Sequence, residues 1–214
     1  KSTIAKLIAR FWDVSEGRIC IGGVDIRKIP LKQLSTYISF VSQDNFLFDC
    51  TLLENIRMGN PESSDNQVIE AAKAARCHEF ITKLYKGYQT TAGEAGNRLS
   101  GGEKQRICIA RAILKDAPIV ILDEATAYTD PENEWEIQKS ISALTKGKML
   151  IVIAHRLTTI RDADKIVLIN NGEVQAEDTH DNLLNQSKVY HNMWNALVNS
   201  KSWIAERKGG QRHA

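Results

Sequence analysis

The sequence predicts an α/β fold with a mostly parallel sheet flanked by helices. Two strongly apolar runs predict its central strands: "PIVIL" leads into Asp123, and "MLIVIA" leads into His155. Both runs are continuously apolar rather than alternating, as expected of parallel strands that helices cover on both faces. The chain has 214 residues, enough for a substantial buried core. We therefore expect a doubly wound sheet.

The amino-terminal part is expected to contribute a helix, a hairpin and a further strand. A helix is predicted over residues 2–11, where apolar side chains follow helical spacing. We expect its buried face to hold Ile4, Leu7, Ile8 and Phe11. In "RICIGGVDI" two short apolar arms flank Gly22-Gly23, which indicates a hairpin. The β-branched run "YISFVSQD" then predicts a strand that ends in polar residues.

Helical spacing dominates from Thr51 to Lys86 and predicts a helical lobe. One side of its longest run is expected to hold Val68, Ala71, Ala72, Ala75 and Phe80. Near the carboxyl end, Asn171-Gly172 lies between alternating arms and predicts a second hairpin. The last stretch, "WIAERKGGQRHA", is basic and is expected to fray.

The overall composition narrows the class of partner. With 28 basic and 26 acidic side chains the net charge is +2, so no strong field indicates a nucleic-acid partner. The longest apolar stretches fall far short of the roughly 20 residues that a membrane span needs. Partners must therefore be argued from motifs.

The four cysteines contain no C-x-x-C pair and lie far apart. We expect Cys20, Cys50, Cys77 and Cys108 to be reduced, buried thiols, as in the cytoplasm. Cys77 and His78 are neighbours, but they lie in an alanine-rich helical run without further ligands nearby. We expect no metal site there.

A first candidate anion site lies in "NRLSGGEKQRICIARAIL". Ser100, Gly101 and Gly102 precede a long run with helical spacing, so they occupy a helix amino terminus. Free backbone N–H groups and the helix dipole favour a phosphate there, and glycines allow close approach. An ordinary N-cap, with Glu103 as a first-turn acid, explains the same residues.

A second candidate site lies where the two apolar strands end. Asp123 and Glu124 follow "IVIL" at the carboxyl end of a parallel strand, where ligands of open α/β sheets bind. Asp123 has the chemistry to hold a hydrated Mg²⁺, and Glu124 could orient or deprotonate a water. His155 follows the other strand and is expected at the same edge. Acids that cap the next helix and a structural histidine are the alternatives.

Together with the opening "KSTIAKLIARFW", these residues resemble the nucleotide-binding domain of ATP-binding cassette (ABC) transporters, a P-loop NTPase fold, from residue 1 to about Asn195. The motifs, which follow the family's order, are the end of Walker A at Lys1-Ser2-Thr3, the Q-loop at Gln43, the signature at Leu99 to Glu103, Walker B at Asp123-Glu124, the D-loop at Asp130 and the switch histidine at His155. Six motifs in order make a chance match improbable.

Two further segments resemble the exporter-fold members of this family. "QDNFLFDCTLLENIRMGNP" is similar to the segment that faces the coupling helices of the membrane domain. "TTAGEAGNRLSGGE" is similar to the exporter stretch that places an acid, here Glu94, before the signature. The resemblance therefore implies a transmembrane domain as partner and a location at the cytoplasmic face of the plasma (inner) membrane.

The resemblance also implies a role for each residue, in a head-to-tail dimer with a second such domain. ATP would contact Lys1, Ser2, Thr3 and Gln43 of one copy and Ser100, Gly101, Gly102 and Glu103 of the other. Mg²⁺ would be held by Ser2, Gln43 and Asp123, while Glu124 polarises the attacking water and His155 senses the γ-phosphate. Asp130 would lie at the dimer contact.

The sequence departs from the family pattern in three places. Glu103 stands where glutamine is commonest in the family. In the D-loop, "AYTD" replaces the more usual Ser-Ala-Leu-Asp, so the contact that Tyr128 and Thr129 make across the dimer is expected to differ from the family's. The strand and glycines that precede the Walker A lysine are not among the 214 residues, so the domain is interpreted as truncated and this chain as unable to hydrolyse ATP.

The implied domain organisation has four parts. A RecA-like core is expected over 1–44 and 118–195, with its amino-terminal strands missing, a helical signature subdomain over 45–117, and a flexible basic tail over 196–214.

Two other functions stay open. One is a soluble cassette ATPase acting on nucleic acid or ribosomes, for which no inserted arm or basic stripe is visible, and the other is a non-catalytic fragment.

Overall fold

The structure is a computed structural model that describes residues 1–123, 131–154 and 160–197. The chain divides into two compact units, Lys1–Ile153 and Ala154–Ala214. The helices of the first unit are α1 (Ser2–Ile8), α2 (Leu31–Tyr37), α3 (Leu52–Arg57), α4 (Asp65–Ala74), α5 (His78–Lys83), α6 (Gly101–Lys115) and α7 (Pro131–Thr145). Its strands are β1 (Cys20–Ile21), β2 (Val24–Asp25), β3 (Ile38–Val41), β4 (Ile119–Asp123) and β5 (Met149–Ile153).

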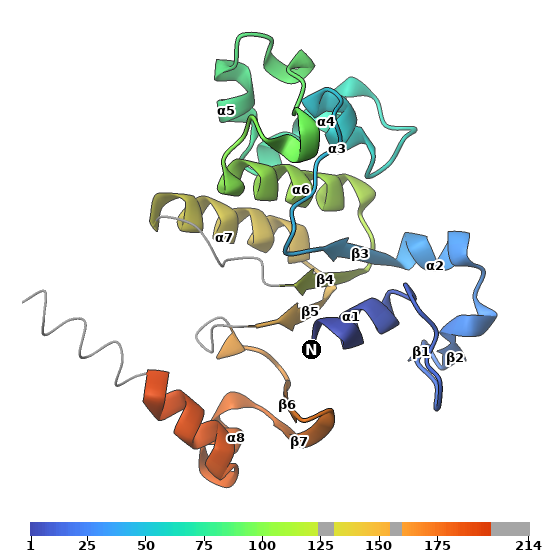
Figure 1. Ribbon diagram of the computed structural model, residues 1–214, viewed down its shortest axis with the longest axis vertical. Helices are drawn as coiled ribbons and strands as arrows, with labels where there is room; N and C mark the ends of the chain where they lie inside the picture. The colour runs from blue at the N-terminus through green and yellow to red at the C-terminus, as the bar shows by residue number, and fades with distance from the viewer. Residues whose placement is uncertain (124–130, 155–159, 198–214) are drawn as a thin grey trace, which may run out of the picture. The chain divides into compact units, whose positions relative to one another are not determined.

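A parallel sheet with the strand order β3-β4-β5 forms the centre of the first unit. The register pairs Val41 with Leu122 and Asp123 with Ile153, so all three strands end at one edge. Helices lie on both sides of this sheet, α6 and α7 on one and α1 on the other (Figure 1). This arrangement confirms the predicted α/β fold with a parallel, helix-flanked sheet.

Strand β4 is buried on both faces, as its continuous apolar run predicts. Val120 and Leu122 pack into the core under α6 and α7, whereas Ile121 belongs to the core on the α1 side. Successive side chains of a strand point to opposite faces, which explains why the first four residues of β4 are all apolar.

Strand β5 differs from the same prediction. Ile151 and Ile153 pack into the core on the α1 side, but Leu150 and Val152 on the other face are 40 % and 38 % exposed. β5 is the edge strand of this sheet, and α6 packs over β3 at the opposite edge. The expectation of cover on both faces is therefore wrong for β5 within the described residues.

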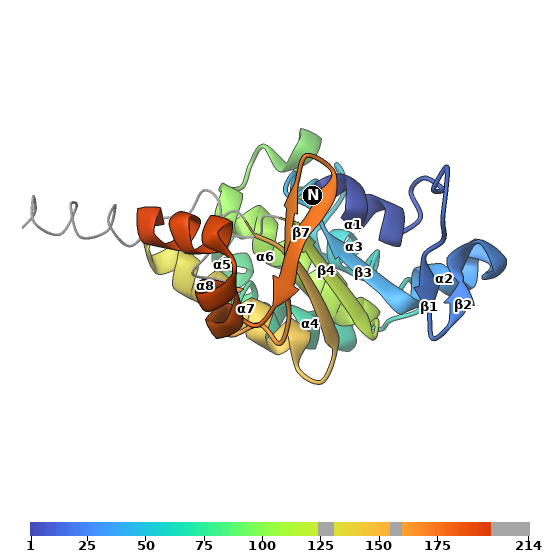
Figure 2. The same ribbon diagram turned by 90° about the horizontal axis from the view of Figure 1, so that it is seen from below.

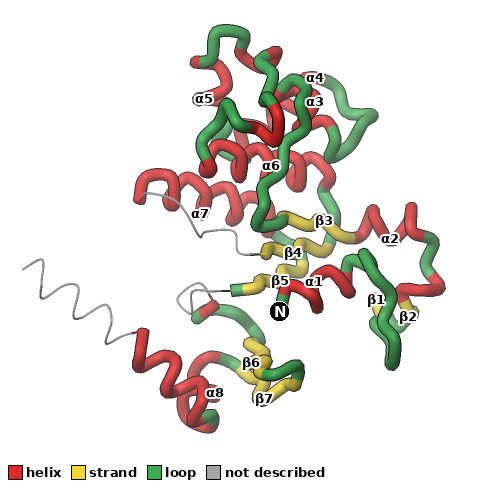
Figure 3. Tube along the Cα trace, in the orientation of Figure 1, coloured by secondary structure: helices red, strands yellow, loops and turns green. Residues whose placement is uncertain are grey.

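The predicted helical lobe consists of α3, α4 and α5 packed around α6 (Figure 3). Three of these helices start at a side-chain cap, whereas α5 does not. Thr51 caps α3, Ser64 forms a capping box with Gln67 at α4, and Ser100 forms one with Glu103 at α6. Such caps satisfy backbone N–H groups that the helix leaves without partners. The expected apolar run is divided between α4 and α5: Val68, Ala71, Ala72 and Ala75 at α4 are buried, and Phe80 of α5 is partly buried.

The hairpin β1–β2 confirms the Gly22-Gly23 turn, because both glycines have positive φ values, 58° and 80°. In both views the hairpin lies near α2, toward the end of the sheet from which β3 starts (Figure 1 and Figure 2).

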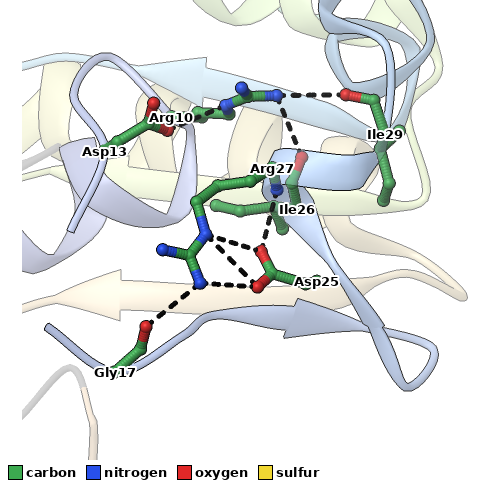
Figure 4. A network of polar contacts seen from close by, with 7 residues as sticks. All are labelled: Arg10, Asp13, Gly17, Asp25, Ile26, Arg27 and Ile29. Carbon is green, nitrogen blue, oxygen red and sulfur yellow. Dashed lines mark hydrogen bonds and ion pairs between the residues drawn. The ribbon is translucent and has the colours of Figure 1, made fainter.

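A polar network joins this region to the end of α1 (Figure 4). Arg27 pairs with Asp25 at 2.7 Å and also donates to the carbonyl of Gly17 at 3.2 Å. The Arg27 side chain and its backbone N–H lower the pKa of Asp25 to about 2.

Arg10 is the second centre of this network. Its backbone is left-handed, with φ 55°, and ends α1 by bonds from Arg10 N to Leu7 O and from Phe11 N to Lys6 O. These two bonds are those of a Schellman motif, which usually places glycine at this position. The Arg10 guanidinium donates to the carbonyls of Ile26 (3.0 Å) and Ile29 (3.1 Å) and, through Nε, to Asp13 (2.9 Å). Side-chain bonds thus compensate for an unfavourable backbone conformation.

The burial of α1 is only partly as expected. Ala5 is its buried residue, and Ile8 packs against the same core. Ile4 and Phe11 are 42 % and 56 % exposed, so the predicted apolar face over residues 2–11 is too wide. The helix ends at Ile8, and the left-handed Arg10 turns the following residues away from the helical spiral.

The second unit contains the hairpin of β6 (Ile166–Asn170) and β7 (Glu173–Asp178), followed by α8 (His180–Gln186). Asn171 and Gly172 have positive φ values, 49° and 85°, as the predicted two-residue turn requires. His180 is buried and its Nδ1 lies 2.8 Å from the Tyr190 hydroxyl. Among the described residues, no helix is both long and apolar enough to span a bilayer. The stretch 203–214, which was expected to fray, lies outside the described residues, and so does the expected tail 196–214 beyond residue 197.

The cysteines are all free, but only Cys77 is buried. Burial raises the pKa of its thiol to about 12. Cys20 is exposed because it lies on the two-stranded hairpin β1–β2, away from the main core. The expectation of four buried thiols is therefore wrong.

Candidate functional site

Two distant parts of the first unit's sequence meet at one hydrogen bond. Ser2 Oγ donates to Asp123 Oδ1 at 3.0 Å, across 121 positions of sequence. Ser2 is the first residue of α1, and Asp123 is the last residue of β4 and is 5 % exposed. The contact arises because α1 packs against β4. It joins the predicted Walker A serine to the predicted Walker B aspartate.

The donor set of this pair suits Mg²⁺. A serine hydroxyl and a carboxylate are hard oxygen ligands, and Mg²⁺ is usually held by one or two such groups together with substrate phosphates. Gln43 follows β3 by two residues at the same edge of the sheet, and its side chain is exposed. All three expected Mg²⁺ ligands, Ser2, Gln43 and Asp123, therefore belong to this edge of the sheet.

Lys1 and Thr3 flank Ser2 and are both exposed. Lys1 is the N-cap residue of α1, and its carbonyl accepts a bond from Ile4 N at 2.9 Å. A lysine ammonium only donates hydrogen bonds, so it suits an anion rather than the backbone N–H groups at this end of the helix. Both side chains can therefore reach a ligand at this end of α1.

The signature residues form the start of α6. Ser100 Oγ accepts a bond from Glu103 N at 3.3 Å, and Glu103 Oε2 accepts one from Ser100 N at 2.8 Å. Gly101 is exposed, and a Cβ added to it would meet no atom within 4 Å, whereas Gly102 is buried. The N-cap reading of this motif is thus correct for the isolated chain. It does not exclude an anion site, because the Ser100 hydroxyl accepts in the capping box and its hydrogen stays free to donate.

The described residues do not bring all predicted site residues together. No hydrogen bond or ion pair of the described part of the chain joins residues 100–103 to Ser2, Gln43 or Asp123. Glu124, Asp130 and His155, and the D-loop neighbours Tyr128 and Thr129, lie outside the described residues.

The neighbours Cys77 and His78 have structural contacts. Cys77 Sγ donates to the carbonyl of Ala72 at 3.3 Å, and His78 Nδ1 lies 2.9 Å from the Tyr88 hydroxyl. Over the described residues, no group of three or more His, Cys, Asp or Glu side chains could hold a metal ion.

Two polar residues of the helical lobe are not among the residues that the sequence motifs single out. Asn55 is fully buried in α3, and Arg111 of α6 donates to it twice, at 2.9 Å each, to the backbone carbonyl and to the side-chain Oδ1. A signal was available, since Asn55 and Arg111 each interrupt an apolar helical run. Both residues contact the loop between β3 and α3, whose Phe46 and Phe48 are each 50 % exposed.

Comparison with known proteins places these motifs in a family. The family described as ABC transporter matches residues 1–127, which is more than half of the chain. An ATP-dependent lipid A-core flippase of Syntrophus aciditrophicus (strain SB) is 49 % identical over 193 residues, covering 90 % of this chain and 32 % of the relative. The putative multidrug export ATP-binding/permease protein YgaD of Bacillus subtilis (strain 168) is 47 % identical over 194 residues, 91 % of this chain and 33 % of the relative.

A solved structure of an ABC exporter is similar to this chain in both sequence and fold. A bacterial Atm1-family ABC exporter with ATP bound is 42 % identical and superposes with a TM-score of 0.86, covering 92 % of this chain and 34 % of that one. This chain thus spans about a third of the length of these relatives. The match over residues 1–127, the ordered motifs and the Ser2–Asp123 contact lead to one conclusion: the chain belongs to the ABC transporter family.

Proposed function

We propose that this chain is the ATP-binding and ATP-hydrolysing part of an exporter-type ABC transporter, and that it powers the transport of a solute across a membrane. The observation that carries the proposal is the Ser2–Asp123 hydrogen bond, which joins two motifs at the carboxyl edge of the sheet. Ligands of open α/β sheets bind at this edge. The names of the relatives, a lipid A-core flippase and a multidrug exporter, support an exporter.

At this edge, Lys1 pairs with the β- and γ-phosphates of ATP and Thr3 contributes a hydroxyl. Ser2, Asp123 and Gln43 would hold Mg²⁺, which when bound would neutralise charge on the transferred phosphate. Glu124 polarises the attacking water, and His155 contacts the γ-phosphate and stabilises the developing charge. Asp123 is buried at a strand end, so its carboxylate is held in place before ligand arrives.

The signature residues act on the nucleotide of a second copy of this domain, identical or related. Ser100, Gly101 and Gly102 approach the γ-phosphate with the free N–H groups of the α6 amino terminus, and Glu103 lies beside them. Asp130 lies at the contact between the copies. Hydrolysis then depends on dimerisation, because each site is completed from the other side.

The membrane domain is the second partner. The exposed rings of Phe46 and Phe48, 5.1 Å apart in an edge-to-face pair, form the part of the segment after Gln43 that faces the coupling helices. The domain works at the cytoplasmic face of the plasma (inner) membrane. Within it, residues 1–44 and 118–195 form the RecA-like core, 45–117 the signature subdomain and 196–214 a basic tail.

The test uses the full-length protein in lipid nanodiscs. We expect Mg²⁺-dependent ATP hydrolysis from the wild type, and no turnover but retained ATP binding and ATP-dependent dimer closure from Glu124→Gln. Normal hydrolysis by Glu124→Gln would remove the assigned role of Glu124. Full activity of a preparation without the membrane domain, unaffected by its addition, would favour a soluble cassette ATPase. A polypeptide of the 214 residues alone is expected to be inactive, because no glycine loop precedes Lys1 within it.

A further inference from the structure

The loop between β3 and α3 presents two aromatic rings on a buried anchor. Phe46 and Phe48 are each 50 % exposed, whereas Leu47 between them is fully buried in the core of the helical lobe. Exposed aromatic rings on a short loop keep one orientation only if the backbone beneath them is held. The hydrogen bonds of residues 46–51 show how this is done.

Asn55 binds the loop backbone from below. Its Nδ2 donates to the carbonyls of Phe48 (2.9 Å) and Thr51 (3.2 Å), and its Oδ1 accepts the backbone N–H of Phe48 at 3.0 Å. The side-chain amide therefore both donates to and accepts from Phe48. Only an amide has a donor and an acceptor at this spacing, so neither aspartate nor leucine can replace all of these bonds.

Arg111 joins the same loop to the signature helix. From α6, its Nε and one terminal nitrogen donate to the backbone carbonyl and Oδ1 of Asn55, both at 2.9 Å. The other terminal nitrogen donates to the carbonyl of Phe46 at 3.3 Å. One guanidinium thus contacts both the loop and the residue that holds it, in the forked geometry that lysine cannot reproduce.

The backbone of α6 at Arg111 lies close to Gly59, which follows the end of α3. A Cβ on Gly59 would lie 2.1 Å from the carbonyl oxygen of Arg111. This close approach leaves α6 little room to move relative to α3 without moving the loop that Asn55 holds. The side-chain bonds and the backbone packing therefore act on the same pair of helices.

We infer that Asn55 and Arg111 are positioning residues that fasten the Phe46–Phe48 face to α6, so that a displacement of the signature at Ser100 reaches the membrane-facing rings. The inference rests on the proposed function, since it needs a nucleotide that moves α6 and a membrane domain that contacts the loop. Neither residue is among those assigned to the nucleotide. Coupling of this kind needs a loop and a helix that move together. The hydrogen bonds of Asn55 and Arg111 connect the loop to α6 in this way.

The test compares variants of the full-length transporter in lipid nanodiscs. Asn55→Leu removes every side-chain bond of Asn55, Arg111→Gln removes the guanidinium that joins the loop to α6, and Arg111→Lys keeps the charge but not the fork. The matched control is Arg57→Gln. Arg57 lies in the same lobe, donates to the carbonyl of Ser63 at 3.1 Å and pairs with Glu54 and Asp65, but none of its bonds goes to residues 46–51.

Two measurements separate positioning from stability. Steady-state ATPase assays should show kcat lower by about tenfold in Asn55→Leu and Arg111→Gln with KM for ATP within about twofold, and an intermediate kcat in Arg111→Lys. Hydrogen exchange of peptides over residues 46–51, with and without ATP and vanadate, should show an ATP-dependent change in the wild type and Arg57→Gln that the two disrupting variants lose.

The inference is overturned if the disrupting variants keep both the kcat and the ATP-dependent exchange of the wild type. It is also overturned if they match Arg57→Gln in both measurements, because the effect would then be general destabilisation of the lobe. Arg111→Lys supplies the same comparison should Arg111→Gln fail to fold. A wild type that hydrolyses no ATP contradicts the proposed function instead, so the two failures are distinct.

Discussion

Ser2 donates a hydrogen bond to Asp123 at 3.0 Å, which joins the first turn of α1 to the end of β4. Asp123→Asn keeps the shape of the side chain but removes the charge that attracts a divalent cation. We expect Mg²⁺-dependent ATPase activity of the full-length protein to fall by about 100-fold or more, because the Mg²⁺-bound phosphate loses a charged ligand. Thermal unfolding should change little. Activity that persists at wild-type Mg²⁺ concentrations would exclude Asp123 as a ligand.

Ser2→Ala tests the structural part of the same contact. Loss of the hydroxyl leaves a buried carboxylate oxygen without its donor, so we expect a loss of about 1–2 kcal/mol in unfolding free energy. Urea denaturation of the 214-residue chain measures it. Thr3→Ala, at the neighbouring exposed position, is the control and should be close to neutral.

Glu103 combines a capping role with an unfavourable charge. Its carboxylate accepts the Ser100 N–H at 2.8 Å, and glutamine can make the same bond without a charge near the phosphate. We expect Glu103→Gln to keep stability and to lower KM for ATP by about threefold, the effect of one charge about 7 Å away in water-like surroundings. Glu103→Ala should lose the cap and about 0.5–1 kcal/mol of stability. A KM unchanged in Glu103→Gln would show that the charge is fully screened.

Substitutions at Gly59 and Gly101 distinguish an effect on packing from an effect on ATP binding. At Gly59 an added Cβ would lie 2.1 Å from the Arg111 carbonyl oxygen, so Gly59→Ala should destabilise the chain by about 1–3 kcal/mol. At Gly101 there is open space, so Gly101→Ala should leave the melting temperature unchanged but lower ATPase activity of the full-length protein, because the methyl group faces the phosphate. Equal melting temperatures for the two variants would contradict the packing argument.

Arg10 holds a left-handed backbone and three side-chain hydrogen bonds at once. Arg10→Ala loses the bonds and keeps the strain, for which we expect about 2–3 kcal/mol of destabilisation. Arg10→Gly loses the same bonds but relieves the backbone, so it should be more stable than Arg10→Ala by about 1 kcal/mol. Denaturant midpoints of both variants measure the difference, and a glycine variant no better than alanine would count against the strain.

The buried thiol of Cys77 predicts a pH dependence. Burial raises its pKa from 9.0 to about 12, so the folded state favours the protonated thiol. That contribution is complete below pH 9 and is lost as the pH rises from 9 toward 12, by at most about 1.4 kcal/mol per pH unit. Between pH 8.5 and 10.5 the melting temperature of the wild type should therefore fall more steeply than that of Cys77→Ala. Cys20→Ala, at an exposed position, should follow the wild type.

Local features of the fold followed from the sequence, because they depend on neighbours along the chain. The turns at Gly22-Gly23 and Asn171-Gly172 need positive φ values, and the cap at Ser100 needs only Glu103 three residues later. The order of the phosphate-binding motifs likewise identified the family, which the match over residues 1–127 then confirmed.

Only the tertiary structure decided which residues lie together and which apolar ones are covered. Burial of a strand face depends on its neighbours in space, so β5 is exposed at Leu150 although its pattern equals that of β4. The bonds of Arg111 to Asn55 and Phe46 span 56 and 65 positions, and no local pattern specifies them. The sequence by itself determined the family and the chemical groups of the site, whereas packing of α1 on β4 and of α6 on α3 decided which of those groups meet.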